Sequence, residues 1–259
     1  MAEKQTDIIR LVDVPYPGTS KPVVTSYQPE IYWSILSERC GAANDQCYVN
    51  HLAVASQAGR NNFSLIAVGY TRTDIARNNL ANSFFEATKR DNDLLVMLDG
   101  DHKYPHDIVA QFANEDPNLG VVGALAYRRG EPYDALWYVR TSDQRLAVPV
   151  EFDRDQVYTC AIVSTSAISI RRWVMVELNR KGYTWPWFRY EYPSDGNIPS
   201  EDMYFGHICE RGGIAHHVDT RIEIPHAGVA WVNHDNHAAY VAAHPEAVSN
   251  DKSVKVEVS

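Results

Sequence analysis

Two aspartates, Asp99 and Asp101, are separated by a single glycine and directly follow the apolar run LLVML. A buried strand ending at this point would deliver both carboxylates to the edge of a sheet, where open α/β proteins place their ligands. Carboxylate oxygens are the ligands that Mg²⁺ and Mn²⁺ take in proteins, and such sites leave coordination positions for phosphate oxygens. The same spacing recurs at Asp91 and Asp153 without an apolar strand to deliver it, so only the copy at Asp99 predicts a metal site.

A second acidic pair, Glu201 and Asp202, opens a predicted helix after a loop broken by proline and glycine. Ser200 is a typical N-cap residue, and acids in a first helical turn are favoured by the helix dipole, so helix stabilisation alone explains this pair. A functional role is indicated by the aromatic residues of the preceding segment, because flat rings suit the apolar faces of sugars. These residues are Trp185, Trp187, Phe188 and Tyr190. Both explanations stay open on the residues alone.

His226 follows Pro225 at the end of a predicted short strand, residues 222–224. Imidazole binds Mn²⁺ as well as Zn²⁺, and a histidine at a strand end can complete a site that distant aspartates begin. We predict surface or packing positions for five further histidines, which are His216, His217, His234, His237 and His244. The histidines and cysteines form no set with the close spacing of a zinc site.

Short apolar runs alternate with helical patterns through the middle of the chain, which predicts an α/β fold with a Rossmann-like, mostly parallel central sheet flanked by helices. Strands are predicted at residues 23–26, 63–70, 93–98, 119–126, 161–170 and 222–224. Helices are predicted at residues 45–58, 173–178 and 201–210, and from residues 74 and 105 onward. Residues 1–22 are predicted to be an irregular lead-in, residues 23–248 a single domain, and residues 249–259 a polar tail.

Composition excludes several classes of protein. The 259 residues are 45% hydrophobic and 11% aromatic, which is enough apolar surface to exclude disorder of the whole chain. The 24 Lys and Arg residues are scattered and outnumbered by 33 Asp and Glu, so binding to bulk nucleic acid is not expected. No apolar run is long enough for a membrane span and the first ten residues lack a signal sequence, so we predict a cytoplasmic protein.

The order of these motifs resembles that of the GT-A glycosyltransferases, especially the compact inverting enzymes of family 2. The resemblance covers roughly residues 23–230 and predicts a single GT-A-like catalytic domain. The matching pieces are Ala76-Arg77-Asn78, Asp99-Gly100-Asp101, Val122-Gly123-Ala124 with Tyr127 and Arg128 beyond, Ile170-Arg171-Arg172, Glu201-Asp202, and His226 before Gly228.

The resemblance implies a metal-dependent transfer of a hexosyl or related sugar from a nucleotide-diphosphate sugar donor, with Mn²⁺ or Mg²⁺ as cofactor. It implies that Asp101 holds the metal directly and that Asp99 reaches the donor ribose or the metal through water. His226 is implied as a further metal or diphosphate ligand. Arg77 is expected near the diphosphate or in contact with the aspartates, which it would fix in place.

For the acceptor, the resemblance implies that Asp202 is the catalytic base and that Glu201 orients the acceptor hydroxyl. A positioned carboxylate that takes the hydroxyl proton in the transition state supplies typically about 10²- to 10⁴-fold in rate. Thr25, Ser26 and Tyr27 are expected to border the nucleotide base. The acceptor itself, whether a glycan, a lipid-linked sugar, a protein or a small molecule, is not specified by the sequence.

The sequence also departs from the family pattern. The acidic turn that usually follows the second strand is replaced by residues 67–72, AVGYTR, which leaves the nucleotide base open. A histidine in the position of His226 is reminiscent of retaining enzymes, so the stereochemical outcome is open, with inversion favoured. A sugar-phosphate nucleotidyltransferase is an alternative, but it would carry a Gly-rich basic loop after its first strand, and residues 25–31 contain no glycine. A non-catalytic carbohydrate-binding protein would have no reason to keep Asp99, Asp101 and Asp202 together.

Overall fold

The structure, a computed structural model, describes residues 29–36, 42–66, 71–191, 199–228, 231–245 and 253–255. Its larger sheet contains seven strands in the order β2-β1-β3-β9-β4-β10-β7. Their bounds are β1 Ile31–Leu36, β2 Ser64–Leu65, β3 Leu94–Asp99, β4 Val121–Ala126, β7 Val157–Cys160, β9 Ala167–Arg171 and β10 His216–Ile224. A second sheet has the order β11-β6-β5-β8, with bounds β5 Trp137–Arg140, β6 Leu146–Glu151, β8 Ile162–Val163 and β11 Ser253–Lys255.

The large sheet is mostly parallel. Strands β1, β2 and β3 pair in parallel, as do β4 and β10. Strand β9 lies between β3 and β4 and is antiparallel to both, so those two strands run in the same direction. Strand β7 is antiparallel at the edge beside β10. The expected α/β fold with a mostly parallel central sheet is therefore confirmed.

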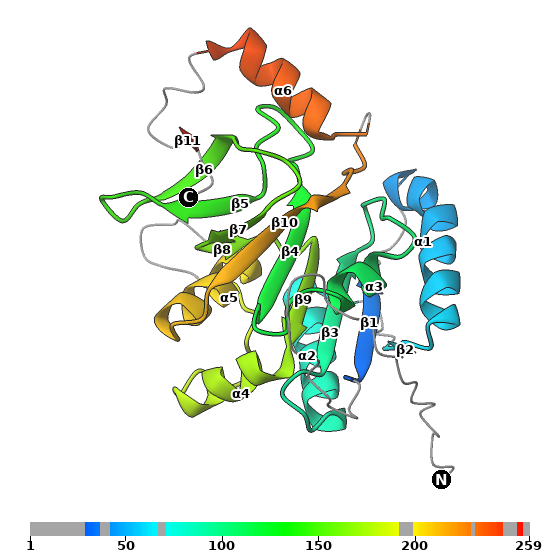
Figure 1. Ribbon diagram of the computed structural model, residues 1–259. Helices are drawn as coiled ribbons and strands as arrows, with labels where there is room; N and C mark the ends of the chain where they lie inside the picture. Colours follow the sequence, from blue (N-terminus) through cyan, green and yellow to red (C-terminus); the bar gives the residue numbers. More distant parts are fainter. Residues whose placement is uncertain are drawn as a thin grey trace, which may run out of the picture.

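Helices cover both faces of this sheet (Figure 1). They are α1 Ala42–Arg60, α2 Thr73–Ala87, α3 Ile108–Ala113, α4 Arg172–Arg180 and α5 Glu201–Arg211, whereas α6 His234–Ala243 lies beside the second sheet, where Nε2 of His237 is 3.1 Å from the carbonyl oxygen of Val150 in β6. Alternate residues of a strand point to opposite faces. In β3, Leu95 and Met97 accordingly join the core under α2, α4 and α5, whereas Leu94, Val96 and Leu98 join the core under α1 and α3. This double burial explains why the strand before Asp99 is apolar throughout.

Several elements differ from their predicted bounds. The strand expected at residues 23–26 lies outside the described residues, and β1 begins instead at Ile31. The single strand expected at residues 161–170 is divided into β8 and β9 by a buried turn, residues 164–166. Strand β10 covers nine residues rather than the three expected. Residues 253–255 of the predicted tail form β11, which pairs in parallel with β6 because an edge strand offers unpaired backbone groups.

The carboxyl ends of β3, β4 and β10 meet at one edge of the large sheet because these strands run in the same direction. The turn after β3 is joined to the segment after β10 by a bridge between His102 and His226. The amide N–H of Ala227 also donates to the carbonyl oxygen of Asp101 at 2.8 Å. Residues that are more than a hundred positions apart are thereby held side by side. Among the described helices, none has the length and apolar character needed to cross a membrane.

Candidate functional site

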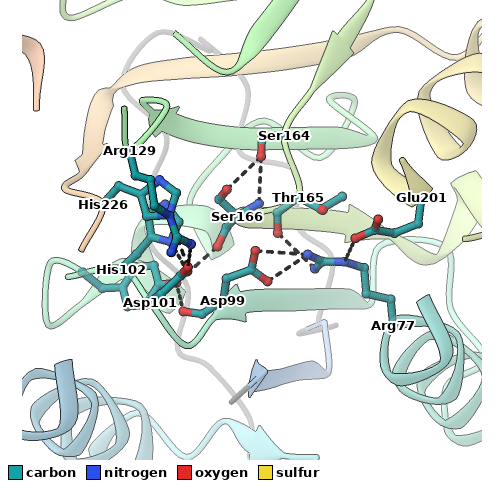
Figure 2. Close-up of polar contacts among 11 residues, drawn as sticks. Arg77, Asp99, Asp101, His102, Arg129, Ser164, Thr165, Ser166, Glu201 and His226 are labelled. Carbon is teal, nitrogen blue, oxygen red and sulfur yellow. Dashed lines mark hydrogen bonds and ion pairs between the residues drawn. The ribbon is translucent and has the colours of Figure 1, made fainter. Parts of the chain in front are cut away.

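The candidate site lies at this strand edge and has two halves joined through the turn after β3 (Figure 2). In Figure 2, nitrogen-bearing side chains surround Asp101 on one side, and Arg77 with Glu201 lies on the other side of Asp99. The first half is a candidate metal centre. The second half is a buried ion-pair network that reaches α5.

Asp101 is the centre of the first half. Its Oδ1 lies 3.0 Å from Nδ1 of His102, and its Oδ2 lies 3.2 Å from Nε2 of His226 and also contacts the Arg129 guanidinium. Burial alone would raise the pKa of the Asp101 carboxyl, but the hydrogen bond from Nδ1 of His102 opposes that rise, and the pKa lies below its usual range. Asp101 is therefore a carboxylate, as a metal ligand must be.

The contacts of His226 indicate that a cation or a proton belongs between its ring and Asp101. Its Nδ1 lies 2.9 Å from the carbonyl oxygen of Tyr127, which can only accept, so Nδ1 carries the hydrogen. In the neutral ring, Nε2 then presents its lone pair to Oδ2 of Asp101. Two electron pairs that face each other at 3.2 Å need a positive charge between them. A backbone carbonyl that fixes the tautomer in this way is also a common second contact of metal-binding histidines.

His102 completes a group of three potential ligands. Its ring stacks on His226 with a centroid distance of 4.0 Å, and its buried Nε2 has no hydrogen-bond partner within the described residues. Burial lowers the pKa of His102 to about 4, so its ring is neutral at pH 7 and has a lone pair for a metal. Sequence reasoning missed this residue, although it directly follows Asp101.

The three side chains fit a divalent transition metal. One ligand atom from each of Asp101, His102 and His226 lies within 4.8 Å of the others. Ligands about 2.1 Å from one ion and at right angles to each other are about 3.0 Å apart, which is close to the 3.2 Å between Nε2 of His226 and Oδ2 of Asp101. Imidazole ligands suit Mn²⁺ and later transition metals better than Mg²⁺, which prefers oxygen.

Arg77 is the centre of the second half. It lies in α2, and only 2% of its side chain is exposed. Its Nη2 donates to both carboxylate oxygens of Asp99 at 2.8 and 3.1 Å, its Nε donates to Oε1 of Glu201 at 3.2 Å, and its Nη1 donates to the carbonyl oxygen of Thr165 at 3.2 Å. One guanidinium therefore ties α2, the end of β3, the turn before β9 and the start of α5 together. Burial raises the pKa of the Asp99 carboxyl, and Arg77 opposes that rise.

Asp202 lies beside this network in the first turn of α5. Its Oδ1 accepts hydrogen bonds from the Ser200 hydroxyl and from the amide N–H of Met203, the latter at 2.8 Å. Ser200 is the N-cap residue, but its hydroxyl donates to Asp202 instead of accepting from a helix amide. Burial raises the pKa of the Asp202 carboxyl, and this makes the ionised form a better proton acceptor.

The structure therefore brings together six predicted site residues, namely Arg77, Asp99, Asp101, Glu201, Asp202 and His226. Thr25, Ser26 and Tyr27 lie outside the described residues. Asp99, which was predicted as a metal ligand or ribose contact, has its carboxylate bonded to Arg77. The sequence also gave no reason to select Arg129, which contacts Asp101 from 28 positions away.

The aromatic segment before α5 is only partly at the surface. Trp187 and Phe188 are buried in the core, where Phe188 stacks on Phe205 with a centroid distance of 4.6 Å. Of the aromatic residues expected to face a sugar, Trp185 is exposed, and half-buried Tyr190 faces Arg72 at 5.7 Å. Two of the four rings are thus packing residues.

No protein-family model matches the sequence, and the comparison with curated proteins finds no match. Solved structures similar to this chain include A197 from STIV, with 16% identity over 80% of this chain and 91% of that chain and a TM-score of 0.49. The mannosyltransferase PcManGT from Pyrobaculum calidifontis, in complex with GDP-Man and Mn²⁺, has 12% identity over 97% and 70% of the two chains and a TM-score of 0.38. A putative glucose-1-phosphate thymidylyltransferase from Bacillus anthracis has 14% identity over 81% and 74% and a TM-score of 0.35.

These structural neighbours include both glycosyltransferases and nucleotidyltransferases. At such identities and TM-scores the likeness extends no further than the arrangement of the chain. An activity has to come from the chemistry of the site.

Proposed function

We propose that this protein is a metal-dependent glycosyltransferase that moves a sugar from a nucleotide-diphosphate sugar to an acceptor hydroxyl. The observation that carries the proposal is the placement of a carboxylate and two imidazoles at the carboxyl ends of parallel strands, beside a buried ion-pair network that leads to Asp202. The first half of the site suits a divalent cation, and the second presents a proton acceptor.

Asp101, His102 and His226 would hold the metal, and Mn²⁺ suits this donor set better than Mg²⁺. When bound, the metal would neutralise the negative charge that the diphosphate leaving group acquires as the donor bond breaks. Asp101 contributes a full negative charge to the site at neutral pH, and His226 is held in a metal-binding tautomer by Tyr127.

Asp202 would take the proton from the acceptor hydroxyl. Both hydrogen bonds that its carboxylate accepts within the described residues go to Oδ1, so Oδ2 is the oxygen suited to the acceptor. A carboxylate with a raised pKa accepts a proton more readily in the transition state. Direct attack by the acceptor with Asp202 as base would invert the sugar configuration.

Arg77 and Glu201 would act by position. Arg77 is buried and bonded to two carboxylates and a carbonyl, so its contacts favour the fixing of Asp99 over direct contact with the diphosphate. Glu201 is 6% exposed and pairs with Arg77 through Oε1, which holds the start of α5 against α2. Its role in orienting the acceptor stays a prediction.

The first experiment measures the binding of nucleoside diphosphates by calorimetry, with and without Mn²⁺. We expect binding that requires the metal and is lost in Asp101→Asn. Asp91→Asn is the matched control, because Asp91 belongs to another Asp-x-Asp pattern. It is exposed and precedes the first residue of β3, so it lies at the end of the strand opposite to the candidate site. Binding that ignores the metal, or no binding of any nucleotide, would contradict the proposal.

The second experiment tests the base. Asp202→Asn should bind the donor as the parent protein does but lose release of nucleoside diphosphate in the presence of a panel of acceptor sugars. Glu210→Gln, at the other end of α5, is the control and should keep the parent rate. Transfer by Asp202→Asn at the parent rate would remove Asp202 from the mechanism.

A sugar-phosphate nucleotidyltransferase is the competing enzyme class. Its phosphate-binding loop would follow β1, where the sequence of residues 37–41 is SERCG, with one arginine and one glycine instead of a Gly-rich loop. Incubation with a nucleoside triphosphate and a sugar phosphate, followed by assay of pyrophosphate, separates the two classes. Pyrophosphate release would favour the nucleotidyltransferase.

A further inference from the structure

Arg129 contacts the carboxylate at the centre of the candidate metal centre (Figure 2). Its Nη2 bonds to Oδ2 of Asp101, the same oxygen that His226 approaches at 3.2 Å. The Arg129 side chain is 55% exposed, whereas that of Asp101 is 26% exposed. The contact therefore joins a surface cation to a partly buried anion.

The loop that carries Arg129 has a fixed base. A bridge joins Tyr127 to Ala135, and the amide N–H of Arg128 donates to the carbonyl oxygen of Asp134 at 2.8 Å. The amide N–H of Leu136 donates to the carbonyl oxygen of Ala126 at 2.9 Å. Arg129 is the first residue beyond this paired base. Its backbone is thus held close to Asp101, while its long, half-exposed side chain can rotate.

A divalent cation and the Arg129 guanidinium compete for Asp101. The N–H of Arg129 points at an Oδ2 lone pair that a metal ligand needs, and two positive charges at one carboxylate repel each other. When the metal takes Asp101, the guanidinium must therefore leave. A planar guanidinium that is released in this way can donate two parallel hydrogen bonds to a phosphate group of the donor.

We propose that Arg129 is an exchangeable counter-ion, which neutralises Asp101 in the metal-free site and binds the donor diphosphate once the metal holds Asp101. The second half of this statement rests on the proposed function, and the first half does not. Without the diphosphate, Arg129 opposes metal binding at Asp101. With the metal bound, Arg129 is available to bind the diphosphate, so it would also make the metal and the diphosphate bind cooperatively.

The test uses Arg129→Ala, with Arg128→Ala as the matched control. Arg128 is the neighbouring residue, is 60% exposed and faces Asp134 at 3.8 Å instead of Asp101. Mn²⁺ binding without nucleotide and nucleoside diphosphate binding at saturating Mn²⁺ are both measured by calorimetry on the full chain.

We expect the two affinities of Arg129→Ala to change in opposite directions. Mn²⁺ affinity should rise about 2- to 5-fold, as for the loss of a half-exposed charge pair. Nucleoside diphosphate affinity should fall about 10-fold, as for the loss of a hydrogen bond to a charged group. Arg128→Ala should leave both affinities within about 2-fold of the parent values.

Each arm has its own refuting result. Unchanged or weaker Mn²⁺ binding by Arg129→Ala would overturn the counter-ion role. Stronger Mn²⁺ binding with an unchanged nucleoside diphosphate affinity would overturn the diphosphate role. If the parent protein binds Mn²⁺ but no nucleotide, the proposed function fails together with the diphosphate role, whereas the Mn²⁺ arm still decides whether Arg129 competes with the metal.

Discussion

Replacement of Arg77 by methionine tests whether a buried guanidinium organises the candidate site. Methionine keeps most of the apolar stem but removes the charge and all four donated hydrogen bonds. Asp99 and Glu201 would then lack their common partner, with side chains that are only 24% and 8% exposed. The expected result is a large loss of stability, because carboxylates in such positions cannot recover full solvation.

The magnitude follows from the type of contact. A hydrogen bond to a charged group contributes about 1.5–3 kcal/mol, but the four bonds share one guanidinium and do not add. Removing one partner of a buried ion pair costs about 3–5 kcal/mol, and we expect the free energy of unfolding to fall by this amount in Arg77→Met. Domains are typically stable by about 5–15 kcal/mol, so the variant should fold with a much reduced margin.

Urea denaturation followed by circular dichroism measures this change. Arg72→Met is the control, because Arg72 lies just before the same helix and pairs with Asp74 through a side chain that is 60% exposed. Its loss should cost at most about 1 kcal/mol. Glu201→Gln in the Arg77→Met background should recover part of the loss, since it removes one unpaired charge. A change below about 1 kcal/mol in Arg77→Met would refute the stabilising role of the buried network.

Two further predictions concern the rest of the fold. Burial, with Asp219 beside it, raises the pKa of Glu115 to about 7, so its native-state ionisation reduces stability as the pH rises. The unfolding free energy of Glu115→Gln relative to the parent should therefore increase between about pH 5 and pH 8 in urea titrations, and a constant difference would contradict the shift. A Cβ at Gly206 would lie 2.6 Å from Cγ1 of Ile162, so Gly206→Ala should cost about 1–3 kcal/mol, and less in combination with Ile162→Ala. Additive costs would show that this contact is not the cause.

The sequence predicts an element correctly where the element's own residues show which of its faces are buried. Strand β3 and helix α2 were found because β3 is apolar on both faces and α2 carries a buried stripe that includes Leu80 and Phe84. Strand β10 was found only in part, since it buries polar residues such as His216, Asp219 and Thr220. Their burial depends on β4 and β7 on either side, which no local pattern reveals.

The candidate site shows the same limit. Asp99 and Asp101 could be selected because they come at the end of an apolar strand, and His226 because it follows a short predicted strand, residues 222–224. His102 and Arg129 could not, because they join the site through contacts made by the folded turn and by a loop. The aromatic segment before α5 illustrates the opposite error, since residue type alone cannot distinguish a ring that faces a ligand from one such as Trp187 that fills the core.

The two aspartates of the Asp-x-Asp pattern contact different cationic partners, although one glycine separates them. Asp99 ends β3, and its carboxylate bonds to Arg77, which is buried and shared with Glu201. Asp101 lies in the following turn, and one of its partners is the half-exposed Arg129. A buried cation that serves several acids cannot leave without uncovering unpaired charges, whereas a half-exposed one exchanges at little cost. A spacing of one residue thus separates a permanent ion pair, which holds α2 and α5 to the sheet, from an exchangeable one at which an incoming cation can bind.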